Sequence, residues 1–366
     1  MTAAAREYPP LREIKGHTDT VFSVVVTPDE QQVISSSVDN TVRVWSLASG
    51  EEIRQLKTPD GTDVVSLAIT PDGHYIVGVC DSADDEDISM CVWDAYSGEQ
   101  TPRLFGYTQY VMALVAVPDR QHVIIGGCDR AVRVWSLEND RELLCFRGHE
   151  ESVQALAVYQ NMVVSGCRRG RVCVWALDDG RELQRFVEPH HRVRSVTTAG
   201  NGQYVVASYW HFMLDTGMIC VWSVASGQMM RYLTGYEGRV ETLATLPDGQ
   251  HIVGGDDRAV RVWSLDSGAV LYSFSPSGFP TVVMPKVAVS HSGKYIIDHE
   301  FLDTNIRVHS PLQYTQHGLR DEYSALQQVA DKINDIDSLV SLMLRGVLMQ
   351  DTALRIRIVE KKLAAL

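Results

Sequence analysis

Short stretches in which apolar and polar residues alternate recur along most of this chain, and they predict β-strands. In the stretch Val21-Phe22-Ser23-Val24-Val25-Val26, successive side chains would point to opposite faces of a strand. Comparable β-branched stretches continue to about residue 309. We therefore expect residues 10–310 to be built from strands.

After residue 310 the apolar residues follow alternating steps of three and four, which is a helical period. We expect residues 311–366 to form an α-helical tail with coiled-coil character. Two alternatives stay open: the tail docks on the rest of the chain, or it pairs with a helix of a partner or of a second copy. The heptad positions are Leu326, Val329, Ile333, Ile336, Val340, Met343 and Val347.

A unit with a tryptophan near its end repeats along the strand-rich part. The tryptophans are Trp45, Trp93, Trp135, Trp175, Trp222 and Trp263, and His309 stands where a seventh is expected. These positions are 48, 42, 40, 47, 41 and 46 residues apart. This period, with four short strands per unit, is typical of propeller blades. The predicted fold is an all-β, seven-bladed β-propeller over residues 10–310.

Other residues recur at fixed distances from the tryptophan. An aspartate stands six residues before it in several units, as at Asp39, Asp129 and Asp257. The dipeptide Gly-His opens two units, at His17 and His149. On these motifs the chain resembles the WD-repeat family from about residue 11 to residue 309, including the repeat region of NACHT-type signalling ATPases.

The resemblance implies a buried hydrogen-bonded network of histidine, serine, aspartate and tryptophan within a blade. The first unit carries the whole set, His17, Ser35, Asp39 and Trp45. The fourth unit has Arg169 in place of the aspartate, and the third and sixth have Ile125 or Val253 in place of the serine. Because a buried donor without a partner costs about 1–3 kcal/mol, we expect the fourth unit to be a functional site or a weak point.

The two ends of the repeat region predict how the ring closes. The seventh unit ends near His309 without an outer strand, and the segment from Leu11 to His17 resembles the outer-strand segment from Leu143 to His149. We therefore expect an N-terminal strand within residues 10–15 to complete the last blade. Closure of this kind leaves no long exposed sheet edge.

Charge and composition narrow the classes of partner. The formal net charge is -13, which argues against nucleic acid or an anionic membrane as the main partner. The chain shows no apolar leader and no run of about eighteen apolar residues. The seven cysteines include no CxxC pair, and most lie in apolar runs, which favours reduced thiols. We expect a cytoplasmic protein, with the nucleus as an alternative.

No catalytic motif is found in the sequence. A Gly-Lys-Ser/Thr phosphate loop, a GxSxG elbow and an HExxH zinc motif are all missing. We therefore expect a protein that is not an enzyme and that has no catalytic, cofactor or metal site.

Arginine and aromatic residues mark the expected binding surface. In the family, the loops between blades and the turns between second and third strands share one face, called the top face here, which is the usual binding surface. The partner-binding residues predicted on it are Arg168, Arg169, Arg192, Arg194, Arg239, Tyr110, Met112 and Phe22. Arginine forks suit carboxylates and phosphates, so we expect an acidic or phosphorylated protein segment as the partner. The alternative is that these arginines pair with local acids such as Glu241, Asp215 and Asp256.

These features favour a non-catalytic protein–protein interaction scaffold, or an adaptor subunit of an intracellular complex. The alternative is a sensor or regulatory repeat domain of a signalling ATPase-type assembly. A ubiquitin-ligase substrate receptor and an enzyme rank lower, because the Trp93-Asp94 segment lacks the arginine expected two residues on and because catalytic motifs are missing.

Overall fold

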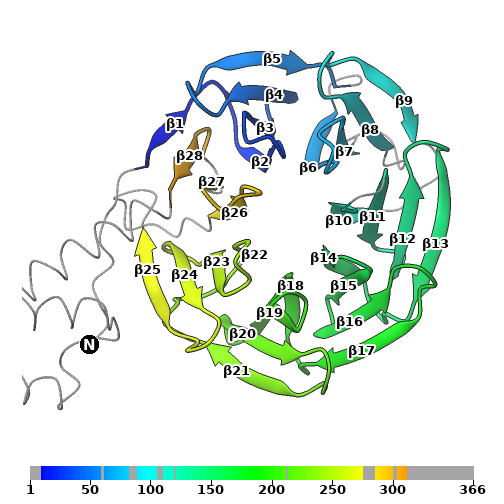
Figure 1. Ribbon diagram of the computed structural model, residues 1–366, viewed down its shortest axis with the longest axis vertical. Helices are drawn as coiled ribbons and strands as arrows, with labels where there is room; N and C mark the ends of the chain where they lie inside the picture. The colour runs from blue at the N-terminus through cyan, green and yellow to red at the C-terminus, as the bar shows by residue number, and fades with distance from the viewer. Residues whose placement is uncertain are drawn as a thin grey trace, which may run out of the picture. The chain divides into compact units, whose positions relative to one another are not determined.

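The computed structural model describes residues 10–58, 62–81, 89–104, 110–118, 121–211, 213–274, 285–299 and 303–310. They form a ring of seven four-stranded antiparallel sheets around a central channel (Figure 1). The prediction of a seven-bladed all-β propeller is confirmed. The predicted helical tail, residues 311–366, lies outside the described residues, so the tail and the boundary at residue 310 stay predictions.

Each blade runs from an inner strand at the channel to an outer strand at the rim. Blades one to three comprise β2 (Val21–Val26), β3 (Gln32–Ser37), β4 (Thr41–Ser46) and β5 (Glu52–Leu56); β6 (Asp63–Ile69), β7 (Tyr75–Asp81), β8 (Ser89–Asp94) and β9 (Gln100–Leu104); and β10 (Val111–Ala116), β11 (His122–Gly127), β12 (Ala131–Ser136) and β13 (Arg141–Arg147).

Blades four to six follow the same plan. They comprise β14 (Val153–Tyr159), β15 (Met162–Cys167), β16 (Arg171–Ala176) and β17 (Glu182–Val187); β18 (Arg192–Ala199), β19 (Tyr204–His211), β20 (Thr216–Ser223) and β21 (Met229–Leu233); and β22 (Thr242–Thr245), β23 (His251–Gly255), β24 (Val260–Ser264) and β25 (Val270–Phe274).

Blade seven joins the two ends of the repeat region. It comprises β26 (Lys286–Val289), β27 (Ile296–His299) and β28 (Ile306–His309), with β1 (Arg12–Ile14) as its outer strand. Strand β1 runs antiparallel to β28, with Arg12 opposite Val308 and Ile14 opposite Ile306. The expected closing strand is thus present, and its Ile14 side chain is buried.

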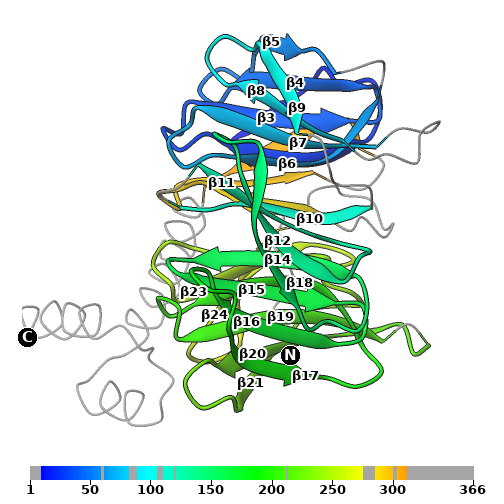
Figure 2. The ribbon, with the colours of Figure 1, turned by 90° about the vertical axis from the view of Figure 1, so that its right-hand side faces the viewer.

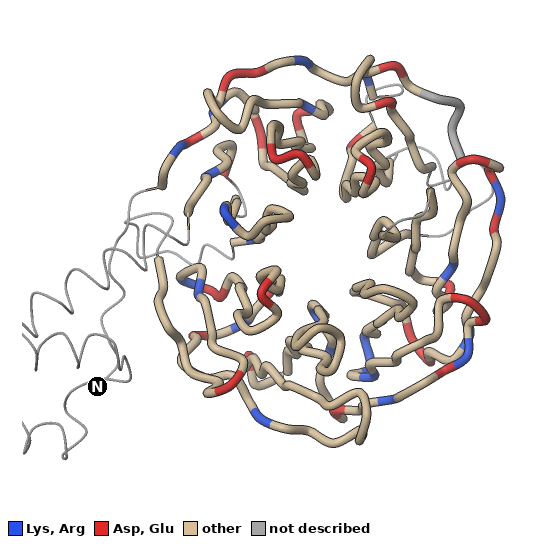
Figure 3. The backbone as a smooth tube through the Cα atoms, viewed as in Figure 1, with Lys and Arg blue, Asp and Glu red and all other residues tan. Residues whose placement is uncertain are grey.

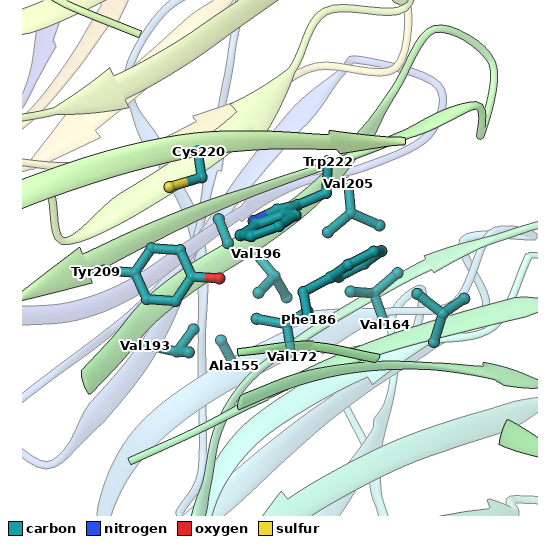
Figure 4. Close-up of a cluster of buried hydrophobic side chains, with 12 residues drawn as sticks. Ala155, Val164, Val172, Phe186, Val193, Val196, Val205, Tyr209, Cys220 and Trp222 are labelled. Atoms are coloured by element: carbon teal, nitrogen blue, oxygen red, sulfur yellow. The ribbon is translucent and has the colours of Figure 1, made fainter. Parts of the chain in front are cut away.

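Apolar side chains between neighbouring blades make up the core, and the blades stack side by side around the ring (Figure 2). Figure 4 shows one such layer, between blades four and five. There the rings of Phe186 and Trp222 stack with centroids 5.1 Å apart. A Cβ on Gly166 would lie within 3 Å of the Val193 side chain, so the glycine lets β18 approach β15 closely. Because every sheet needs its neighbours in this way, the repeats form one cooperative ring.

Cys80 on β7 and Cys91 on β8 are joined by a disulfide. The expectation of reduced thiols is therefore wrong for this pair. The two cysteines are eleven residues apart in sequence, and the β7–β8 hairpin brings their Cα atoms to 6.6 Å, within the disulfide range. A search for closely spaced pairs does not detect such a cross-strand bridge.

In the part of the chain that the structure describes, no helix has the length and apolar character needed to cross a membrane.

Candidate functional site

A recurring β-bulge sets which side chains line the central channel. The register of the first five inner strands shifts by one residue near its start, as between Val21 and Ser23 in β2. A bulge re-aims the residue that it leaves unpaired. The unpaired residues are Phe22, Val65, Met112, Gln154 and Arg194, and all five line a channel cavity of about 400 Å³.

Two of the cationic groups in this cavity are held by neighbouring blades. Arg194 Nε donates to Glu241 Oε2 at 2.9 Å, and Lys286 Nζ donates to the carbonyl of Phe22 at 3.1 Å. Burial lowers the pKa of Lys286. Arg194 therefore follows the alternative expectation, that the arginines pair with local acids, because Glu241 balances its charge within the channel.

Trp210, at the end of β19, brings three of the predicted arginines together. The guanidinium carbons of Arg192, Arg194 and Arg239 lie 5.7, 6.0 and 5.1 Å from the centre of its ring. The indole N–H donates to Asp215 Oδ1 at 3.0 Å. The repeat pattern did not indicate Trp210, because it lies in the β19–β20 hairpin, which is longer than the matching hairpins of blades one, three, four and six. The 47-residue spacing of this unit was the available signal.

Arg239 also lies near two carboxylates. Its Nε is 4.0 Å from Asp215 and 3.8 Å from Asp257, and burial raises the pKa of Asp257. The predicted cluster of five arginines therefore divides. Arg194 and Arg239 lie partly buried beside acidic groups, while Arg168 and Arg169 are exposed on blade four.

A second cavity, of about 610 Å³, lies on the top face where blade four meets the loops on either side of it. We call it the basic groove. Its basic residues come from the β15–β16 turn, from the loop before β18 and from the first residues of β16 and β18. Figure 3 shows lysine and arginine positions along the backbone of blades four and five. The groove is lined by Glu150, Glu151, Cys167, Arg168, Arg169, Arg171, Val187, Pro189, His190, His191 and Arg192.

Positive charge concentrates in the basic groove. Burial, with the neighbouring charges of Arg168 and Arg194, lowers the pKa of Arg192. Arg169 reaches Glu150 at 3.4 Å, but both side chains are more than half exposed, so this pair contributes little. Of the other predicted residues, Tyr110 and Met112 are exposed on blade three and Phe22 lies at the channel.

Blade one carries the predicted hydrogen-bonded set as a continuous chain. Trp45 Nε1 donates to Ser35 Oγ at 2.7 Å, Ser35 Oγ lies 2.7 Å from His17 Nε2, and His17 Nδ1 lies 2.9 Å from Asp39 Oδ2. The aspartate also accepts the backbone N–H groups of Thr18 and Thr41. Burial lowers the pKa of His17 despite this neighbour.

Blade four keeps the tryptophan, serine and histidine of this hydrogen-bonded network and lacks the aspartate. Trp175 Nε1 donates to Ser165 Oγ, which lies 2.7 Å from His149 Nε2. His149 Nδ1 is buried and has no hydrogen-bond partner. Burial and the charge of Arg171 lower the pKa of His149 to about 4, so the ring is neutral at pH 7.

Blade six differs from its expected register. Asp256, not Asp257, is fully buried and accepts the N–H groups of Glu237 and Ala259. The serine position holds Gly254, not Val253, since Gly254 pairs with Arg261 as Ser35 pairs with Arg43. The turn is one residue shorter than in blade one, with four residues between Gly255 and Val260 against five between Ser36 and Val42, and this moves the serine position to Gly254.

Comparison with known families agrees with the repeat pattern. The family model for the WD domain, G-beta repeat, matches residues 8–46, 98–136, 140–176 and 227–264. Each matched segment begins near the outer strand of one blade and ends with the third strand of the next. One sequence repeat therefore supplies the outer strand of one blade and the first three strands of the next, as the segment from β1 to β4 does.

The chain is also similar to longer proteins of several kinds. It is 25% identical over 198 residues to Autophagy-related protein 16 of Arabidopsis thaliana, covering 53% of this chain and 38% of that protein. It is 23% identical over 233 residues to the guanine nucleotide-binding protein subunit beta of Nicotiana plumbaginifolia, covering 49% and 62%. It is 31% identical over 129 residues to the ribosome biogenesis protein WDR12 homolog of Oryza sativa subsp. japonica, covering 35% and 25%. In each case the match spans less than two thirds of the relative.

Proposed function

Since the chain carries WD40 repeats in a seven-bladed propeller, we propose that it is a non-catalytic protein-interaction scaffold or adaptor subunit of an intracellular complex. The proposal extends to the contact itself: the basic groove binds an acidic or phosphorylated segment of a partner protein. We propose the cytoplasm, or the nucleus, as its location, and the Cys80–Cys91 disulfide is the feature that counts against this location, because such bonds are rare there.

The observation that carries the proposal is the local charge of the basic groove. The whole chain has a net charge of -13, yet Arg168, Arg169, Arg171 and Arg192 line one cavity. Guanidinium groups bind carboxylate and phosphate oxygens in pairs of charge-assisted hydrogen bonds. Exposed Val187 and the neighbouring Pro189 add an apolar wall against which a peptide could pack.

The relatives support a role in assemblies. One of them is named as a subunit of a guanine nucleotide-binding protein. We extend this to the chain only in general terms, as a surface that holds another protein.

The test reverses the charge of the basic groove and leaves the channel arginine in place. Arg168, Arg169 and Arg192 are changed together to glutamate, and Arg194 is kept because it pairs with Glu241. Proteins captured by the tagged wild type and by the variant are compared by mass spectrometry, at low and at high salt. We expect the variant to lose salt-sensitive partners while its Tm stays close to that of the wild type.

A chain that lacks residues 322–366 separates this proposal from the alternative that the tail makes the main contact. Loss of every captured protein on tail deletion, with no loss from the arginine variant, would refute a partner site in the basic groove.

A further inference from the structure

The fourth blade holds its histidine as the first blade does. His149 Nε2 lies 2.7 Å from Ser165 Oγ, the distance between His17 Nε2 and Ser35 Oγ. The His149 and Trp175 rings meet at 65°, and those of His17 and Trp45 at 68°. The two imidazoles therefore have the same orientation within their blades, and each directs Nδ1 toward the turn between its second and third strands.

That turn in blade one is filled by the carboxylate of Asp39. It lies 2.9 Å from His17 Nδ1 and accepts the N–H groups of Thr18 and Thr41 at 3.0 and 3.1 Å. By register, the matching groups in blade four are His149 Nδ1 and the N–H groups of Glu150 and Arg171. Both turns also have a left-handed residue at the same position, since Asn40 has a φ of 59° and Gly170 one of 75°.

Nothing in blade four takes the place of that carboxylate. Arg169 stands at the Asp39 position, but its side chain is 68% exposed and turns to the surface. His149 is only 7% exposed, and its Nδ1 has no partner. A buried nitrogen without a partner costs about 1–3 kcal/mol, so the blade keeps an unused position for an acceptor.

Two guanidinium groups converge at the mouth of this position. Arg171 donates to Glu150 Oε1 at 2.5 Å, and Arg169 lies 3.4 Å from Glu150 Oε2. Glu150 is 52% exposed and comes from the loop before β14, so it can leave without disturbing a strand. All three residues line the basic groove.

We propose that this turn is a socket for one anionic oxygen of the partner segment, a carboxylate or a phosphate, which occupies the place that the Asp39 carboxylate has in blade one. In the complex the partner's anion replaces Glu150 between Arg169 and Arg171 and accepts a hydrogen bond from His149 Nδ1. The histidine donates as a neutral ring, with Nδ1 carrying the proton. This inference deepens the proposed function and rests on it.

The proposal identifies the anchor of the binding site. Arg168 and Arg192 attract the segment by charge, whereas the socket accepts a single acidic group at one fixed point. Because the hydrogen bond from His149 is formed in a buried position, it adds selectivity for a group that can enter the turn.

The decisive variant is Arg169→Asp, which supplies the missing acceptor from the chain itself. Binding of a fluorescent polyglutamate peptide and of a phosphoserine peptide is measured at low salt, with a polyglutamine peptide as the neutral reference. We expect a rise in Tm of a few degrees, because His149 gains its partner, and a loss of affinity for both anionic peptides of at least about tenfold.

A variant in the matching turn of blade three controls for the charge change alone. Arg130 lies in the corresponding turn of blade three, next to Asp129, and is exposed. Arg130→Asp makes the same change of charge on the same face but fills no socket, so it should leave Tm and both affinities unchanged. A second variant, Glu150→Gln, removes the competing carboxylate and should tighten binding.

An independent readout follows the histidine itself. The ring nitrogen resonances of His149 should shift when polyglutamate or inorganic phosphate is added to the wild type, and should not shift in Arg169→Asp. If only the phosphoserine peptide and phosphate bind, the partner's anion is a phosphate; if polyglutamate also binds, a carboxylate suffices. Either result supports the socket.

Two results overturn the socket. One is full binding by Arg169→Asp, and the other is binding by the wild type without any change at His149. If either result is found and the Arg168→Glu/Arg192→Glu variant also loses binding, the basic groove is still a partner site, but it holds the partner by surface charge and not through the socket. Failure of the wild type to bind any anionic probe would refute both.

Discussion

The guanidinium of Arg239 lies over the indole ring of Trp210, 5.1 Å from its centre, and this contact joins blades five and six on the top face. Arg192 and Arg194 approach the same ring. An aromatic ring attracts cations through its negative face, so Trp210 can hold three like charges that would otherwise repel one another.

Replacing Trp210 therefore should destabilise the protein. Trp210→Ala should lower the free energy of unfolding by about 1–3 kcal/mol, because several cation–π contacts are lost together. Trp210→Phe keeps an aromatic face and should cost less. Urea denaturation of both variants makes the comparison, and an equal loss from both would show that these contacts are not stabilising.

The aspartate of blade one should matter more than the arginine at the same position of blade four. Asp39→Ala leaves His17 Nδ1 and two backbone N–H groups without their acceptor, and should lower the free energy of unfolding by about 1–3 kcal/mol. Arg169→Ala removes only an exposed ion pair and should change it by less than about 0.5 kcal/mol. Thermal or chemical denaturation measures both values. Equal losses would mean that the aspartate does not brace its blade.

The buried histidine of blade four should make stability fall in acid. The pKa of His149 is about 4 in the folded chain, where burial and Arg171 disfavour the charged ring, against about 6.5 in an unfolded chain. Between these values the unfolded chain binds the extra proton, so stability is unaffected above pH 6.5 and decreases as pH falls toward 4. The slope from this group is up to about 1.4 kcal/mol per pH unit.

His149→Gln removes that slope. Urea denaturation of wild type and variant across this pH range gives the difference. His299, whose pKa burial lowers to about 3, should still contribute to the slope in both proteins. A variant as acid-sensitive as the wild type would contradict the assignment.

Loss of the closing strand should affect the whole ring. Deleting residues 1–15 removes β1 and the buried Ile14 side chain, whose burial alone contributes about 1.5–3 kcal/mol. We expect a large fall in Tm, whereas deletion of residues 1–9 keeps β1 and should have little effect. Differential scanning calorimetry distinguishes them, and equal melting of the two shortened chains would argue against closure as a source of stability.

The repeat made most of the fold predictable. Because each tryptophan follows a β-branched strand at a regular spacing, the blade count, the closing strand and the chain of contacts from Trp45 to Asp39 could be inferred without coordinates. In blade six the same counting assigned the serine and aspartate positions to residues one place away from the correct ones. Gly255 pairs with Val260, whereas Ser36 pairs with Val42, and counting back from the tryptophan does not register the shorter turn.

The site was harder to predict, because its contacts cross between blades. The sequence placed the arginines on one face but did not separate Arg194, which pairs with Glu241 of the next blade, from exposed Arg168. Blade seven shows the same limit. His309 stands where the other units have tryptophan, and it lies 2.5 Å from buried Asp298, which no repeat position indicated.

The way in which β1 completes blade seven also gives the chain a means of linking to its own copies. If β1 detaches, the strand Ile306–His309 exposes an unpaired edge that fits the segment Arg12–Ile14 of any molecule. A second chain could supply that segment, and its own vacant edge could take a third. Partial opening of the ring would then lead to strand-exchanged dimers or open-ended chains, with a yield that rises with protein concentration.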